Sequence, residues 1–156
     1  MKKYNPSRSD IHFLARGLLV TKEGNIILCR AKGKEFFFLP GGHIENGESA
    51  KEALIREIHE EIGDIGQKIM SFMGVSENIF EHENALQHEL NIIFEVKVSQ
   101  EEVESRKNHI EFVTIKGKDI EKTQILPIEV KEGLLEWMEN KNPFFKELNT
   151  SKNVCE

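Results

Sequence analysis

The chain has 156 residues, 38% of them hydrophobic, which is the size and composition of one compact domain that folds without disulfides. Its longest apolar runs, residues 17–20 and 25–29, are far shorter than the ~20 residues that cross a bilayer, which excludes a transmembrane protein. Lys and Arg total 21 against 27 Asp and Glu, and the resulting net charge of -6 has the wrong sign for an extended nucleic-acid surface. Any chemistry on phosphates therefore needs a cation.

The beginning of the chain and its cysteines bear on where the protein resides. Residues 1–10 are polar and lack the apolar stretch of a secretory signal, so we expect a cytoplasmic protein. The two cysteines, Cys29 and Cys155, provide neither a disulfide framework nor a thiolate metal site. We expect both to be plain thiols.

The first part of the chain predicts a hairpin and a glycine-rich loop. Residues 12–20 and 26–30 are largely apolar and β-branched or aromatic, and the turn-forming residues 22–25 separate them. A third short strand over 36–39 ends at the Pro-Gly-Gly triplet 40–42. The two glycines free the backbone there for a close approach.

A helix is predicted after this loop. Ser49 and Glu52 have the spacing of a capping box, in which the hydroxyl and the carboxylate satisfy the first backbone N–H groups of a helix. Gly63 ends the helix. Its apolar stripe, which we expect to pack against a sheet, recurs at every fourth residue: Ala50, Leu54, Ile58 and Ile62.

The second half predicts further strands and a second helix. Apolar and polar residues alternate over 90–98, the period of a half-buried strand, and residues 69–75 and 112–116 are weaker strand candidates. The charged residues 100–107 suit a loop or a short solvated helix. Pro127 suits a first helical turn. The helix after it carries an amphipathic stripe made of Val130, Leu134 and Trp137.

These elements predict an α/β fold with a mixed sheet between helical layers. We expect residues 1–156 to form a single domain, with the segment 1–10 and the tail 143–156 as its flexible parts. Phe144 and Phe145 leave a second alternative open for the tail, in which their rings dock it onto the domain.

Three carboxylates on the first predicted helix point to chemistry. Glu57, Glu60 and Glu61 lie at i, i+3 and i+4, within an arc of about 100° beside the apolar stripe. Their mutual repulsion is relieved either by full hydration, as for most helix glutamates, or by divalent cations among the oxygens. Hard oxygen ligands favour Mg²⁺, Mn²⁺ or Ca²⁺ over softer metals.

The residues around these carboxylates resemble the Nudix box, G-x5-E-x7-R-E-U-x-E-E-x-G-U, where U is a bulky aliphatic residue. The resemblance covers residues 42–64, and the preceding glycine loop and the order of strands extend it to most of the chain. One position departs from the pattern: Asp64 stands at the final aliphatic position, with Ile65 one residue later. The matching residues are Gly42, Glu48, Arg56, Glu57, Ile58, Glu60, Glu61 and Gly63.

The resemblance implies a Nudix fold, an α/β/α sandwich, and a metal-dependent pyrophosphohydrolase. Its substrate would be a nucleoside diphosphate linked to another moiety X, such as a nucleoside triphosphate, a nucleotide sugar or a dinucleotide, attacked by water at phosphorus. Mg²⁺, with Mn²⁺ as substitute, would be held by Glu57, Glu60, Glu61 and the Gly42 carbonyl. We expect Glu48 and Arg56 to pair with each other and anchor the loop, since a guanidinium fits a carboxylate with two hydrogen bonds. Metal ligation is the second role for Glu48.

Three further residues are candidates outside the box carboxylates. Glu89, at the start of the alternating strand, is the candidate general base beside them, against the alternative of an exposed strand carboxylate. Arg30, at the end of the second strand, and His43, inside the glycine loop, are candidate phosphate contacts. The alternatives are that Arg30 is an exposed surface residue and that His43 only packs within the loop. One ring of residues 36–38 could stack on a base, although most of that run suits the core.

Several functions share this motif. The leading alternative is a catalytically silent Nudix domain that senses a nucleotide, although such domains usually lose box carboxylates and none is lost here. Messenger-RNA decapping would be expected to need a basic RNA surface, and isomerisation of isopentenyl diphosphate needs residues that we do not identify. We therefore expect a small-molecule nucleotide as partner, no nucleic acid and no membrane, and the resemblance is compatible with a homodimer.

Overall fold

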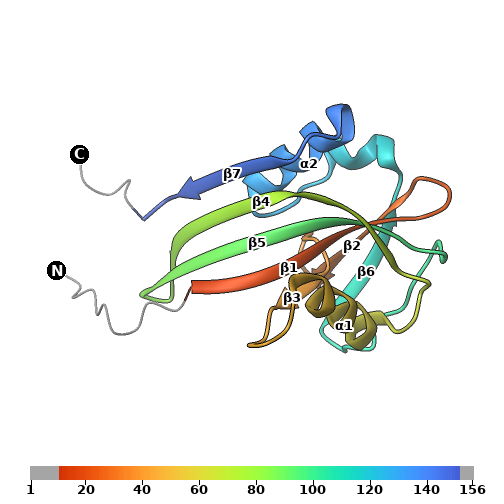
Figure 1. The fold of residues 1–156 in the computed structure, drawn as a ribbon, viewed down its shortest axis with the longest axis horizontal. Coiled ribbons are helices and arrows are strands. Elements are labelled where there is room, and N and C mark those ends of the chain that lie inside the picture. The colour runs from red at the N-terminus through yellow and green to blue at the C-terminus, as the bar shows by residue number, and fades with distance from the viewer. Residues whose placement is uncertain (1–10, 152–156) are drawn as a thin grey trace.

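The structure, a computed structural model, describes residues 11–151. The segment 1–10 and residues 152–156, with Cys155, lie outside the described residues, so the expectations for them are not addressed. The described chain forms one seven-stranded mixed sheet with a helix on each face, an α/β fold (Figure 1). Within residues 11–151 no helix is both long enough and apolar enough to span a membrane.

The sheet has the order β6-β2-β1-β5-β4-β7, and β3 pairs with β1 beside this path. The pairs β1–β5 and β4–β7 are parallel and the others antiparallel. The strands are β1 (Ile11–Val20), β2 (Ile26–Ala31), β3 (Gly41–His43), β4 (Lys68–His82), β5 (Ala85–Lys97), β6 (Ile110–Ile115) and β7 (Phe144–Asn149). The helices are α1 (Ala50–Ile62), the short 3-10 helix η2 (Gly117–Lys122) and α2 (Ile128–Asn140).

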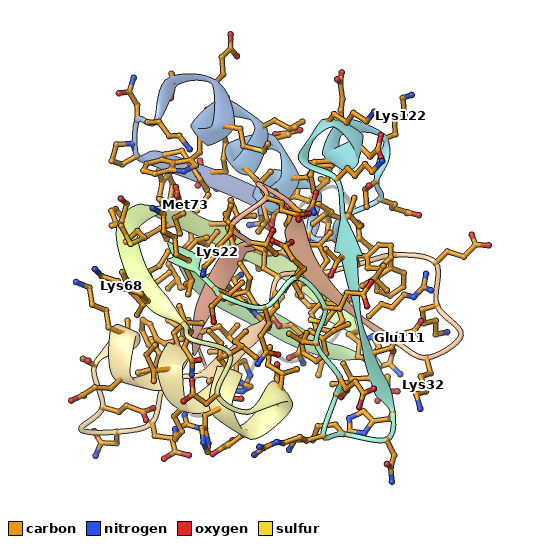
Figure 2. All side chains as sticks on the ribbon, turned by 90° about the vertical axis from the view of Figure 1, so that its right-hand side faces the viewer. Lys22, Lys32, Lys68, Met73, Glu111 and Lys122 are labelled. Atoms are coloured by element: carbon orange, nitrogen blue, oxygen red, sulfur yellow. The ribbon has the colours of Figure 1, made fainter. Side chains whose placement is uncertain are left out.

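The core lies in two layers, one on each face of the sheet, which Figure 2 shows with α2 above and α1 below. In one layer the predicted stripe of α1 packs on alternate residues of β1 and β5, such as Leu19 and Val96. In the other, the stripe of α2 packs on the opposite residues, such as Leu18 and Ile93. Alternate strand residues point to opposite faces, so the two helices bury different halves of the same strands.

The predicted hairpin is present as β1 and β2, but residues 36–39 do not form the expected strand. Phe38 pairs only with Cys29, whereas the backbone of Phe37 bonds to Gln124 and Leu126. Successive residues thus have different partners, and no ladder forms. The glycine loop itself provides the strand β3. Gly41 adopts a φ of 141°, and a Cβ there would lie 3.0 Å from the Ala15 carbonyl carbon of β1, so only glycine allows this pairing.

Strands β4 and β5 form a hairpin much longer than the sequence predicts. The expected strands 69–75 and 90–98 extend to residue 82 and back to residue 85. Glu83 and Asn84 make the tight turn, with φ of 48° and 64°. A two-residue turn with positive φ at both positions matches the twist of an antiparallel pair. The added residues mix polar and apolar types, which is why their pattern did not indicate strands.

Part of the tail expected to be flexible is a strand, because residues 144–149 form β7 on the edge of the sheet. Phe144 is buried in the core layer under α2, whereas the Phe145 ring is 60% exposed. One of the two rings therefore docks this segment.

Candidate active site

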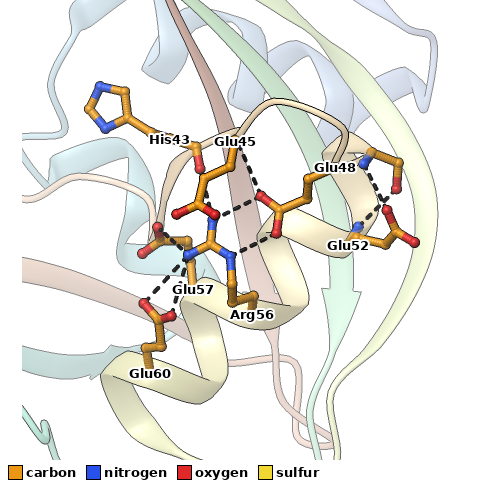
Figure 3. Close-up of polar contacts among 8 residues, drawn as sticks. His43, Glu45, Glu48, Glu52, Arg56, Glu57 and Glu60 are labelled. Carbon is orange, nitrogen blue, oxygen red and sulfur yellow. Dashed lines mark hydrogen bonds and ion pairs between the residues drawn. The ribbon is translucent and has the colours of Figure 1, made fainter.

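The centre of the site is Arg56 of α1, which joins the helix to the loop before it (Figure 3). Its Nε and Nη2 donate to the two oxygens of Glu48, at 2.7 and 2.9 Å, and Nη2 also donates to the His43 carbonyl at 3.0 Å. Nη1 donates to Glu57 at 3.0 Å and lies 3.4 Å from a Glu60 oxygen. The expected pairing of Glu48 with Arg56 thus takes the two-bond geometry.

These contacts fix the charge of the loop. The Arg56 hydrogen bonds, aided by backbone donors, lower the pKa of Glu48 to about 2. Glu48 in turn raises the pKa of Arg56. The pair is therefore an ion pair at every physiological pH, and it holds the residues between β3 and α1 in one conformation.

The ends of α1 are set by local sequence. Ser49 accepts from the Glu52 backbone N–H at 3.2 Å and Glu52 accepts from the Ser49 backbone N–H at 2.8 Å, which is the predicted capping box. At the other end Gly63 caps the helix with a φ of 81°. Ile65 is buried in the core under α1, and Asp64 accepts from the Gly66 N–H. The aliphatic residue one position late therefore fills the core, which explains how the departure from the motif is tolerated.

Gly42 and Glu57 lie in direct contact. A Cβ on Gly42 would fall 2.6 Å from each carboxylate oxygen of Glu57, so the missing side chain leaves space for that carboxylate against the backbone of β3. This close approach brings the backbone of the glycine loop and the helix carboxylates to one point.

Glu61 is half-buried one turn after Glu57, and its Oε2 is buried without a hydrogen-bond partner among residues 11–151. Burial, assisted by the charge of Glu57, raises the pKa of Glu61 to about 7, although Arg16 acts in the opposite direction. A buried carboxylate oxygen without a partner is uncommon, because desolvation is costly. Positive charge placed beside it would stabilise its ionised form.

The carboxylate and carbonyl oxygens of the site suit a hard divalent cation, although the side chains do not point to one common position. No three His, Cys, Asp or Glu side chains within the described part of the chain are gathered closely enough to hold a metal ion together. Figure 3 shows that Arg56 contacts both Glu57 and Glu60. The orphaned oxygen of Glu61 and the space over Gly42 nevertheless fit a cation bound by oxygen ligands.

A second wall of the site comes from the sheet, and Arg16 of β1 is its main feature. Arg16 donates through Nε to the Asn91 side-chain oxygen and through Nη1 to the Leu39 carbonyl, both at 3.3 Å. Its charge acts on Glu61, and its guanidinium lies 6.0 Å from the centre of the Phe38 ring. Arg16 therefore adds a positive charge that acts on a carboxylate of the box.

Glu89 is half-buried on β5, between His12 of β1 and Asn78 of β4. His12, the partner of Glu89 on β1, also contacts the glycine loop, because its Nδ1 is 3.1 Å from His43 Nε2. Glu89 and His43 thus belong to the same end of the sheet.

Arg30 has its charge matched by a neighbour. Its guanidinium pairs with Glu111 of β6, labelled in Figure 2, and lies 4.8 Å from the centre of the Phe37 ring. Phe37 is a core residue and Phe38 is half-buried, so Phe38 is the more accessible ring of the two. The phosphate contact of Arg30 stays a prediction.

Sequence reasoning missed Arg16, His12 and Asn91. Arg16 interrupts the apolar residues of β1, on the strand face that also carries Leu14 and Leu18. A charged residue on a strand face that is otherwise apolar was the available signal, because such a residue needs a partner inside the protein.

A model of the NUDIX domain matches residues 11–143 of this chain. The chain belongs to the Nudix family. The match includes the box and both walls of the site described above. It begins with β1 and ends after α2, so the Nudix domain accounts for nearly all of the described chain.

Two curated relatives of this Nudix chain match over short stretches. An ADP-ribose pyrophosphatase of Methanocaldococcus jannaschii is 43% identical over 60 residues, which cover 36% of this chain and 35% of the relative. A putative 8-oxo-dGTP diphosphatase of Bacillus subtilis is 41% identical over 46 residues, covering 30% and 31% of the two chains. The matched part thus spans about a third of the length of these relatives.

Solved structures show the same Nudix fold over the whole domain. A MutT protein from Bacillus halodurans superposes with a TM-score of 0.67 at 16% identity, over 92% of this chain and 93% of the other. At this identity the likeness concerns the fold alone.

Proposed function

We propose that this Nudix protein is a pyrophosphohydrolase that cleaves a nucleoside diphosphate linked to another moiety X. The observation that carries the proposal is the complete set of box carboxylates, with Glu57 against Gly42 and Glu61 holding an unpartnered oxygen. The buried, unpartnered oxygen of Glu61 is costly for the folded protein unless positive charge is supplied. The family, in which divalent cations are the general rule, provides the context.

A divalent cation, Mg²⁺ or Mn²⁺, would be held by Glu57, Glu60, Glu61 and the Gly42 carbonyl. When bound, it supplies the positive charge that offsets the diphosphate and eases attack by water. Arg56 would keep Glu48 while it releases Glu57 and Glu60, because its two bonds to Glu48 are the shorter ones.

The residues of the chain itself would position and activate the reactants. Glu89 accepts a proton from the attacking water, whose oxygen forms a bond to phosphorus as the bridging P–O bond breaks. Arg16, Arg30 and His43 donate to the phosphate oxygens. The products are two phosphate-bearing fragments, and the proton leaves Glu89 for solvent.

The test is a hydrolysis panel with Mg²⁺ and with Mn²⁺. It includes nucleoside triphosphates, 8-oxo-dGTP, ADP-ribose, nucleotide sugars and dinucleotides, because relatives of this chain carry the names of two such activities. We expect turnover that Glu60→Gln lowers by roughly 100-fold or more, as for lost transition-state charge stabilisation. Glu139→Gln removes an exposed glutamate from α2 and should keep the activity.

The absence of turnover on every compound, by a folded wild-type protein with either cation, would overturn this proposal. Tight nucleotide binding without product would then favour the alternative of a nucleotide-sensing Nudix domain.

We also place the protein in the cytoplasm, where nucleotides and Mg²⁺ are plentiful.

We further propose a homodimer, because part of the sheet is uncovered. Figure 1 shows β4, β5 and β7 continuing well beyond α1. On the α1 face of this extension Phe145 neighbours Val75, which neighbours Ile92, and Phe13 neighbours Leu90. The apolar surface of the most exposed side chains, Ile11, Phe13, Phe72 and Phe145, amounts to roughly 300–400 Å².

A second copy of the chain is the occupant that suits this face. A two-fold axis brings the same apolar patch of two copies together, so that each copy covers the exposed rings of the other.

A further inference from the structure

Three lysines surround one cavity at the end of the sheet where β1 and β5 finish and β4 begins. Lys22 follows β1, Lys97 is the last residue of β5, and Lys68 is the first residue of β4. All three line a cavity of about 380 Å³, which is in the size range of small-molecule sites. Figure 2 looks onto this end of the molecule and labels Lys22 and Lys68.

The positive charge around this cavity is not matched by carboxylates. Among residues 11–151, none of the three ammonium groups forms an ion pair. Glu95, two residues before Lys97, pairs instead with Lys141. Glu101, four residues after Lys97, accepts from the turn between β1 and β2. Three unpaired lysines at one cavity require an explanation in a chain whose net charge is -6.

Two of these lysines also repel each other. Lys68 and Lys97 are direct partners in the antiparallel pair of β4 and β5. Opposite residues in such a pair have Cβ atoms about 5 Å apart, and like charges in this arrangement destabilise the sheet. An anion between the two ammonium groups would replace this repulsion by attraction.

Another wall of the cavity is fixed by backbone contacts. Ser99 donates to the Ile65 carbonyl through its backbone N–H at 2.9 Å and through its Oγ at 3.0 Å. Gly66 adopts a φ of 67°, and a Cβ there would fall 2.2 Å from the Ser99 Oγ. The chain after α1 therefore lies directly on the segment after β5, and the three lysines surround a preformed space.

The cavity is separate from the candidate active site. None of its lining residues belongs to the box. Ala15 of β1 pairs with Gly42 of the box, whereas Val20 of the same strand lines the cavity. Five residues of a strand span about 17 Å, so a ligand in the cavity does not occupy the position of the box.

We propose that Lys22, Lys68 and Lys97 form an anion site outside the box, which binds a chain of two phosphates. Lysine ammonium groups bind phosphate oxygens as point charges. Lysines on two opposite strands and on a turn can contact oxygens of two neighbouring phosphate groups. The same group of two phosphates occurs as free diphosphate and within nucleoside diphosphates, and the experiment distinguishes these two sources.

The experiment measures diphosphate binding by calorimetry and by thermal unfolding, in EDTA at low ionic strength. Without a divalent cation, the carboxylates of the box do not attract the anion. We expect diphosphate to bind the wild-type protein and to raise its thermal midpoint, because the ligand binds the folded state. Added salt should weaken this binding.

Single substitutions locate the bound anion. Lys68→Gln and Lys97→Gln should each raise Kd for diphosphate by roughly tenfold, as for the loss of one charge-assisted contact. Lys122→Gln makes the same change of charge at an exposed lysine of η2, labelled in Figure 2, and should keep the wild-type Kd. Arg30→Gln, which alters the candidate active site, should also keep it.

ADP and free diphosphate separate the two sources of the ligand. Equal affinities would show that the site accepts nucleotides, and a preference for diphosphate would identify the free ion as the ligand, so both results support the site. No binding of either compound at millimolar concentration, or a wild-type Kd in both Lys68→Gln and Lys97→Gln, would overturn the proposal. A loss of binding in Arg30→Gln would overturn it too, because the anion would then lie at the candidate active site. None of these measurements uses hydrolysis, so they are independent of the proposed function.

Discussion

Two carboxylates of the site, Glu48 and Glu61, have pKa values that are shifted in opposite directions. Glu48 is paired with Arg56 and has its pKa lowered from 4.5 to about 2, so its contribution to stability is present above pH 4.5 and is lost as the pH falls to about 2. Glu61 is half-buried without a partner for one oxygen, and its pKa is raised to about 7. Glu48 stabilises the loop through its ion pair with Arg56. The ionised form of Glu61 destabilises the folded protein unless a positive charge lies beside it.

The cost of Glu61 gives a prediction at this scale. Between pH 4.5 and 7 the unfolded chain ionises Glu61 while the folded chain keeps its proton. The free energy of unfolding should therefore fall as the pH rises through this window, by at most about 3 kcal/mol. Denaturant unfolding in EDTA should show a flatter pH dependence in Glu61→Gln than in the wild type.

Other groups, such as Glu129, titrate in both proteins, so the difference between the two curves isolates Glu61. Mg²⁺ should stabilise the wild type more at pH 8 than at pH 5.5, because the cation binds the ionised carboxylate. Equal pH dependence of the wild type and Glu61→Gln would contradict this account of the site.

At the scale of elements, α2 and β7 depend on each other through two glycines. A Cβ on Gly133 of α2 would overlap the Phe144 ring, and one on Gly74 of β4 would fall 2.7 Å from the nearest atom of that ring. The Phe144 ring thus occupies the space that both glycines leave, and this packing holds β7 on the sheet edge.

Gly133→Ala provides the corresponding prediction. In an exposed helix interior this change stabilises by about 1 kcal/mol, because alanine has the higher helix propensity. Here the added methyl group displaces Phe144, and overpacking costs typically about 1–3 kcal/mol. We expect a lower thermal midpoint for Gly133→Ala, and recovery of the midpoint in the double variant with Phe144→Leu. A midpoint above that of the wild type would show that β7 does not depend on this contact.

For the whole molecule, the relevant feature is that one helix covers only part of its sheet face. Helix α1 covers the end of the sheet that carries the box, and the extension of β4, β5 and β7 leaves Phe13 and Phe145 50% and 60% exposed. Large exposed apolar patches mark interaction surfaces.

Phe145→Asp tests the proposed dimer. Light scattering after size exclusion should give the mass of two chains for the wild type and of one chain for the variant, since a charge in a self-complementary patch meets its own copy. Met138→Asp introduces the same charge at an exposed apolar position of α2 and should leave the dimer intact. A wild-type protein that is monomeric at high micromolar concentration would refute the proposal.

The sequence by itself determined the box, its helix and the layered fold. These features rest on local chemistry: the capping box of Ser49 and Glu52, the stripe of α1, and the alternation in β5 act between residues close in the chain. The family match bears out the resemblance that the box suggested. The long β4–β5 hairpin and β7 were missed because their mixed residues satisfy strands only through neighbours that the chain brings from elsewhere.

Only the tertiary structure decided which side chains face the box. Arg16 bonds to Asn91 because β1 and β5 pair in parallel, a contact across more than seventy residues, and its charge acts on Glu61. Glu129 belongs to no motif of the sequence, and the burial of this residue in the first turn of α2 becomes visible only when helix and sheet pack. Burial and the loss of water are properties of the folded packing, so no local pattern could reveal which polar groups the fold leaves unpaired.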